Sequence, residues 1–194
     1  MPLDRDADYL SYLYTCNRCR SCAVDDTPEM RPVCPSYARF GYFAYSGGGK
    51  GYVAHGILEG KTRPSAEAAE VAMNCLLCGA CARMCPPGFD TLSFIRDLRD
   101  LLVRKGHMAN ERHRALLERA RGGSPWGKAA DLPDLPVHTG GEEVLVFLGC
   151  RERARPGVIG PLQQILASAG VSWGVLDEEP CCGAPLRDLG DAKA

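Results

Sequence analysis

The sequence predicts a protein of two parts: an α-helical domain and, after a linker, a partial α/β domain built on a parallel βαβ unit. Three observations support this prediction. Two cysteine motifs of one pattern lie in the first half, apolar residues at helical spacing surround the second motif, and a strand–helix–strand pattern lies near the end of the chain. The predicted ranges are 1–121 for the helical domain, 122–142 for the linker and 143–194 for the α/β part.

The motif at residues 75–86 reads C-x2-C-x2-C-x3-C-P. This spacing is typical of a [4Fe–4S] cubane cluster, which four cysteine thiolates hold. In ferredoxins with two clusters, the fourth cysteine of the run ligates the other cluster. The motif therefore predicts a partner upstream. A C-x2-C-x2-C triplet at residues 16–22 and a Cys-Pro pair at residues 34–35 supply one.

We therefore expect two [4Fe–4S] clusters that exchange their fourth ligands. The predicted ligands are Cys16, Cys19, Cys22 and Cys85 for one cluster, and Cys75, Cys78, Cys81 and Cys34 for the other. Each cluster would close a long loop, and cross-links of long loops remove the most chain entropy. Two structural zinc sites built from the same thiolates are the alternative, although zinc sites usually show paired C-x2-C knuckles without a third cysteine.

The segment 46–51, Ser-Gly-Gly-Gly-Lys-Gly, is a candidate phosphate-binding loop. We reject that interpretation, because a phosphate loop needs G-x4-G-K-[ST] after a buried strand, and we predict a flexible turn instead. Helices are predicted at residues 52–60 and 66–73, from about residue 91 to a stop at Gly106, and at residues 110–121.

The α/β part has a second set of cysteines. Its predicted elements are a strand at residues 143–149, a helix at 161–169 and a strand at 171–176. Cys150 follows the first strand, and Cys181 and Cys182 follow the second. In a parallel sheet all three lie at the carboxyl edge, where open α/β folds bind ligands, so we expect them to converge on one site.

Composition limits the function classes. The net charge of −1 gives no field for nucleic acid or an anionic membrane, and no apolar run of about 18 residues is present. Eleven cysteines at regular metal-binding spacings favour a reducing compartment over a disulfide framework. The first residues do not read as a signal peptide. We therefore expect a cytoplasmic protein, with docking on a membrane through a partner as an alternative.

These motifs resemble a known family. The two cysteine motifs and their helices look like the α-helical ferredoxin module of heterodisulfide reductase subunits and of glycolate oxidase iron–sulfur subunits. The segment from Cys150 to Cys181-Cys182-Gly183 looks like the opening of that family's cysteine-rich CCG domain. The resemblance implies an iron–sulfur subunit that relays single electrons in a hetero-oligomer with a flavoprotein or a membrane cytochrome. It also implies a non-cubane [4Fe–4S] cluster at Cys150, Cys181 and Cys182 if the CCG domain is complete.

One departure from the family is large. A full CCG domain ends with a further C-x2-C, which this sequence lacks after Gly183, so we expect a truncated domain. Two other functions stay open: a disulfide reductase with its active site at the CCG cysteines, and a zinc-stabilised interaction module. No catalytic residue is predicted. Arg18, Arg20 and Arg83 lie in or beside the cysteine loops, where they either tune potentials, dock an acidic partner or are ordinary surface residues.

Overall fold

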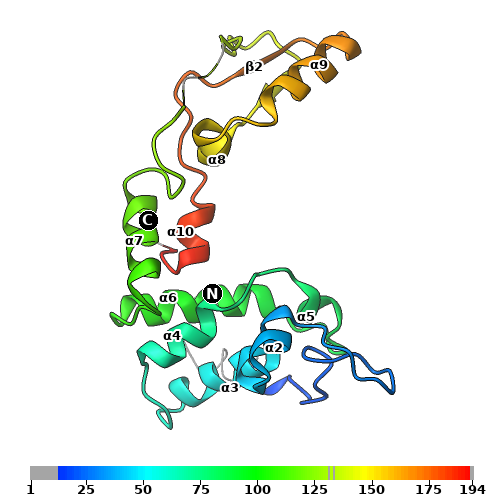
Figure 1. Cartoon of the computed structure of the whole chain (residues 1–194), viewed down its shortest axis with the longest axis vertical. Helices are drawn as coiled ribbons and strands as arrows, with labels where there is room; N and C mark the ends of the chain where they lie inside the picture. The colour runs from blue at the N-terminus through cyan, green and yellow to red at the C-terminus, as the bar shows by residue number, and fades with distance from the viewer. Residues whose placement is uncertain (1–12, 131, 133, 193–194) are drawn as a thin grey trace. The chain divides into compact units, whose positions relative to one another are not determined.

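The computed structural model describes residues 13–130, 132 and 134–192, which are mostly helical with one small parallel sheet (Figure 1). The expected combination of a helical module and an α/β region is confirmed at this level. Two compact units are present, residues 1–115 with 186–194 and residues 116–185. Within the described ranges, no helix is long and apolar enough to cross a membrane.

The first unit is a helical assembly whose core lies between α3, α4 and α6. Its elements are α2 (Pro35–Phe40), the 3-10 turn η1 (Phe43–Tyr45), α3 (Gly47–Leu58), α4 (Ala66–Met73), α5 (Ala80–Arg83) and α6 (Thr91–Arg104). Phe94, Leu98 and Leu102 recur at helical spacing on α6 and are buried in this core. The small residues Ala54 on α3 and Ala72 on α4 let the three helices approach closely.

The predicted helices at 66–73 and after residue 91 are confirmed, and both begin at a side-chain cap. The Ser65 hydroxyl accepts a hydrogen bond from the Ala68 N–H at 3.2 Å, and an Asp90 carboxylate oxygen accepts one from the Ser93 N–H at 3.1 Å. The helix predicted at 110–121 is α7 (Glu111–Arg121).

The prediction of a flexible turn at 46–51 was wrong. Ser46 caps α3, because its Oγ accepts a hydrogen bond from the Gly49 N–H at 3.0 Å, and the glycines form the first helical turn. Glycine is an unfavourable helix former, so sequence propensity argued against a helix here. A Cβ at Gly49 would lie 1.8 Å from the Phe43 carbonyl oxygen, which shows that the packing requires glycine.

The second unit contains the predicted βαβ unit. Strand β1 (Val144–Val146) pairs in parallel with β2 (Trp173–Val175), and α8 (Gly149–Ala154) and α9 (Ile159–Ala169) lie between them in the chain. The register places Val144 opposite Trp173 and Val146 opposite Val175. The cysteine expected to follow the first strand, Cys150, lies in the first turn of α8.

Part of the predicted linker is ordered against the sheet. The Val175 N–H donates to the Pro136 carbonyl and the His138 N–H donates to the Val175 carbonyl, both at 2.8 Å, which makes a parallel bridge at Val137. A Cβ at Gly174 would lie 2.8 Å from the His138 backbone. Gly174 therefore lets residues 136–138 approach β2. Their pairing adds to the two-stranded sheet, which would be only marginally stable alone.

The C-terminal helix α10 (Ala184–Leu189) follows the CCG cysteines, and its residues from Leu186 onward belong to the first unit. The His113 Nε2 atom lies 2.8 Å from the Leu189 carbonyl oxygen, and the Asp188 backbone and side chain contact α6. These hydrogen bonds explain why this end of the chain belongs to the first compact unit and not to the predicted range 143–194. The ranges 1–121, 122–142 and 143–194 stay a prediction.

Candidate metal centre

The two cysteine loops share left-handed backbone at equivalent positions. In the loop at 16–22, Arg18 and Arg20 take left-handed φ values of 60° and 69°. In the loop at 75–81, Leu77 and Gly79 occupy the equivalent positions with φ of 53° and 81°. Left-handed non-glycine residues cost about 1–3 kcal/mol each and gather at functional sites. Turns of this kind aim successive N–H groups into one concavity, as at many iron–sulfur sites.

The eight cysteines of the two motifs line two separate cavities of the first unit. The first cavity is lined by Cys16, Cys19, Cys22 and Cys85. The second is lined by Cys34, Cys75, Cys78 and Cys81. These are the two groups that the exchange of Cys34 and Cys85 predicts, although ligation itself stays a prediction.

The pKa values of two thiols, one in each group, reflect the same grouping. Burial raises the pKa of Cys81, and the charges on Cys75 and Cys34 raise it further, whereas a hydrogen bond with Thr91 lowers it. Burial likewise raises the pKa of Cys22, with a smaller contribution from Cys16. Clustered thiols that resist ionisation need a cationic partner to become thiolates together, and a metal core supplies that charge.

The N-terminus of α3 contacts both cysteine groups. The Gly48 N–H donates to the Cys22 Sγ at 3.1 Å. A Cβ at the preceding residue, Gly47, would lie 2.8 Å from the Cys81 Cβ, and one at Gly48 would lie 2.9 Å from the Cys22 Sγ. The glycine-rich segment is therefore where the helix fits between the two sites. Sequence analysis missed this role, and the run of three glycines was its only signal.

All eleven cysteines lie in the described residues, and all are free thiols. The described part of the chain contains no group of three His, Cys, Asp or Glu placed to hold a single metal ion. A zinc site needs such convergence on one ion, whereas a cubane takes one thiolate at each of four iron atoms spread around its core. The four cysteines at each cavity supply the four thiolates that a cubane takes, and the glycines beside Cys81 and Cys22 place no Cβ against them.

Comparison with known proteins agrees with this geometry. Residues 12–89 match the family model described as a 4Fe-4S dicluster domain. The chain contains a 4Fe–4S dicluster domain. The matched range includes all eight cysteines of the two cavities and ends before Cys150, Cys181 and Cys182. No curated protein and no solved structure gave a significant match to the chain.

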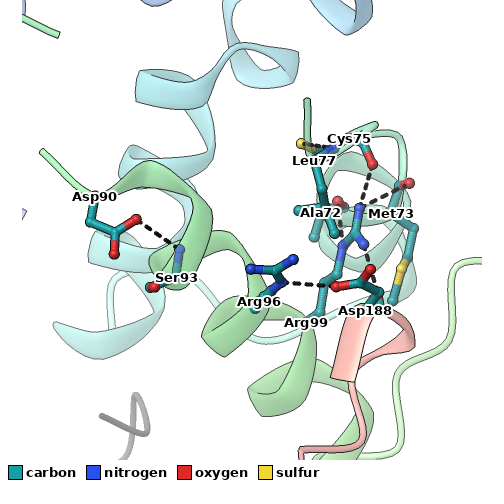
Figure 2. A network of polar contacts seen from close by, with 9 residues as sticks. All are labelled: Ala72, Met73, Cys75, Leu77, Asp90, Ser93, Arg96, Arg99 and Asp188. Atoms are coloured by element: carbon teal, nitrogen blue, oxygen red, sulfur yellow. Dashed lines mark hydrogen bonds and ion pairs between the residues drawn. The ribbon is translucent and has the colours of Figure 1, made fainter. Parts of the chain in front are cut away.

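A buried arginine donates hydrogen bonds to the backbone at the start of the second cysteine loop of the dicluster domain (Figure 2). Arg99 on α6 is 4% exposed. Its guanidinium donates to the Cys75 and Asp188 carbonyl oxygens, both at 2.6 Å, and to the Ala72 carbonyl oxygen at 3.1 Å. Burial lowers the pKa of Arg99, while the charges on Cys75 and Asp188 raise it. Arg99 thus joins the end of α4, the start of the loop and α10.

The three remaining cysteines line a cavity in the second unit. Cys150, Cys181 and Cys182 share this cavity with Arg153 and Glu179. The Glu179 side chain is 3% exposed and pairs with the Arg153 Nε at 3.2 Å. It also accepts hydrogen bonds from the Leu148 N–H at 2.6 Å and the Gly149 N–H at 2.7 Å, just before Cys150. The strand ends therefore bring these thiols to one place, as the βαβ pattern predicts, while cluster binding there stays a prediction.

Two exposed arginines border the first cavity of the dicluster domain. The Arg18 guanidinium carbon lies 5.6 Å from the centre of the Tyr52 ring, and that of Arg20 lies 5.7 Å from the centre of the Phe43 ring. Both arginines line the cavity, whereas Arg83 on α5 does not. Cation–π contacts with these rings hold the two guanidinium groups at the entrance of the cavity.

Proposed function

We propose that this chain is the iron–sulfur electron-transfer subunit of a heterodisulfide reductase-like oxidoreductase complex, with two [4Fe–4S] clusters in its dicluster domain. The observation that supports it most is the sorting of eight cysteines into two cavities of four, with Cys34 and Cys85 exchanged between the motifs. The resemblance of the cysteine motifs and of the CCG segment to that family supports the choice of complex.

The geometry suits a relay of single electrons. A [4Fe–4S] cluster, when bound, accepts and releases one electron, at a potential that hydrogen bonds to sulfur, charge and solvent exposure set. The chain supplies a sulfur hydrogen bond from Gly48 to Cys22 and a hydroxyl, Thr91 Oγ1, at 3.0 Å from the Cys81 Sγ. Gly47 lies against Cys81 of one group and Gly48 against Cys22 of the other, so adjacent residues of one helix approach both sites.

We propose a flavoprotein or a membrane cytochrome as the redox partner, docking over the first cavity. Arg18 and Arg20 are exposed there and are held by aromatic rings, so they can pair with carboxylates on a partner surface. The eleven free thiols support a cytoplasmic, reducing location.

The test of this proposal is anaerobic analysis of iron and acid-labile sulfide. Two cubanes give about eight of each per chain, four per cluster. Cys78→Ser should lower both contents to about half, because it removes a ligand of one cluster only. Zinc without sulfide in the purified protein would end the redox proposal.

A disulfide reductase is the second candidate, favoured by the convergence of Cys150, Cys181 and Cys182 on one cavity. In that reaction a disulfide takes two electrons, delivered singly through the relay from a reduced flavoprotein, and two protons to give two thiols. The assay supplies a reduced dye and measures thiol formed from disulfide substrates, with Cys181→Ser as the matched variant. Turnover of artificial donors and acceptors alone, without thiol production, would leave the electron-transfer subunit as the function.

A further inference from the structure

Lys50 is a buried charged residue of the second cavity that neither cysteine motif explains. We propose that Lys50 places a buried positive charge beside the cluster of Cys34, Cys75, Cys78 and Cys81 and thereby makes it the higher-potential cluster of the pair. This inference rests on the proposed two-cluster function. It adds an order of reduction potentials, in which an electron that enters the dicluster domain resides on the second site.

The position of Lys50 is built into the fold. The side chain lies in the first half of α3, is fully buried at 0% exposure and lines the second cavity with the four cysteines. Its Nζ donates to the Tyr45 carbonyl oxygen, and the Cys34 Sγ lies 3.7 Å from that same oxygen. The ammonium and a predicted cluster ligand therefore meet at one carbonyl group.

The groups that counter this charge are the cysteines. Burial lowers the pKa of Lys50, and the charges on Cys75, Cys34 and Cys81 are the leading influences that raise it again. A lysine is seldom buried without a negative partner, because desolvation of the ammonium is costly. Thiolates around a cluster supply the partner here, so a purely structural lysine does not account for the choice of residue.

The effect on the cluster has a definite sign. Reduction adds one negative charge to a site that already holds four thiolates, and a nearby cation stabilises the reduced form more than the oxidised form. The interaction is strong because the Lys50 side chain and the Cys81 thiol are buried, so little water screens the charge between them. The cations at the first cavity, Arg18 and Arg20, are exposed, so water and salt screen them. Lys50 therefore raises the potential of the second site more than the arginines raise that of the first.

The experiment is a redox titration of both clusters in the reconstituted full chain, monitored by electron paramagnetic resonance. The signal of the second site is identified as the one that Cys78→Ser perturbs. Lys50→Met removes the charge and keeps an unbranched side chain. Lys50→Arg keeps the charge, and Lys61→Met is the matched control, since Lys61 is an exposed lysine whose side chain is 73% exposed.

We expect Lys50→Met to lower the reduction equilibrium constant of the second site at least tenfold, which is 59 mV for one electron. Lys50→Arg and Lys61→Met should stay close to the wild-type potential, and the first site should shift less. An unchanged potential in Lys50→Met, or an equal shift in Lys61→Met, would overturn the inference.

Failure of a variant to hold its cluster is also informative. If Lys50→Met loses one cluster while Lys50→Arg keeps both, the charge is needed at this position, as proposed. If Lys50→Arg loses the same cluster, shape rather than charge decides and the inference is wrong. Failure of the proposed function is distinct, because it appears already in the wild-type chain as zinc in place of iron and sulfide.

Discussion

Replacing Arg99 by methionine tests whether the dicluster domain depends on the network in Figure 2. The variant Arg99→Met keeps the apolar stem but leaves the Cys75 and Asp188 carbonyl oxygens without their donor, and both hydrogen bonds are 2.6 Å long. A hydrogen bond from a charged donor is worth about 1.5–3 kcal/mol. Two of them give about 3–6 kcal/mol, and relief of the buried charge returns part of this. We expect a net loss of about 3 kcal/mol in the free energy of unfolding.

The assay is guanidinium unfolding of the cluster-loaded chain, followed by loss of visible absorbance and of helical circular dichroism. Arg96→Met is the matched control on the same helix. Arg96 pairs with the Asp188 carboxylate at 2.8 Å, but the two side chains are 27% and 42% exposed, so its loss should cost below about 1 kcal/mol. Equal midpoints for Arg99→Met and Arg96→Met would refute the reasoning.

Three further predictions follow from particular contacts. In Gly49→Ala the new Cβ would lie 1.8 Å from the Phe43 carbonyl oxygen, so this variant should lower the iron content of the protein. In Gly51→Ala the new Cβ would meet nothing within 4 Å, so this variant should raise the free energy of unfolding by about 1 kcal/mol. Burial lowers the pKa of His113 below its ordinary 6.5, so its contribution to stability is complete above pH 6.5 and is lost as the pH falls. Urea midpoints on either side of pH 6.5 should show this loss, and His113→Gln should reduce it. Glu179→Ala removes a buried carboxylate that pairs with the half-buried Arg153 and accepts two backbone hydrogen bonds, and it should cost about 3 kcal/mol of unfolding free energy. Glu178 is exposed, so Glu178→Ala should change little, and equal effects in calorimetry would contradict the assigned role of Glu179.

The two sets of four cysteines that line the cavities are the sets that the cysteine spacing predicts as ligands, while ligation stays a prediction. The helix at 66–73 and α6 were also predictable, since each combines a side-chain cap with a regular apolar face. The strand–helix–strand pattern of the second unit was predictable because short runs of β-formers flank the helical segment at residues 161–169, which is part of α9; α8 was not predicted.

The rest depended on contacts between distant residues. The glycines at 47–49 argue against a helix by propensity, and only their approach to Cys81, Cys22 and the Phe43 carbonyl explains why they form one. The bridge at Val137 was not predicted, because the surrounding glycines and prolines are typical of a linker. The burial of Arg99 and Lys50 was not predicted, because long charged side chains are mostly exposed and the groups that accept their hydrogen bonds here are backbone carbonyls.

The central claim is that Cys34 and Cys85 exchange clusters. Electron paramagnetic resonance of single cysteine-to-serine variants tests it most directly, because each substitution perturbs the spectrum of the cluster that it ligates. Cys34→Ser should alter the signal that Cys78→Ser alters, and Cys85→Ser the one that Cys19→Ser alters. If Cys34→Ser instead perturbs the same signal as Cys19→Ser, each motif holds its own cluster and the account is wrong.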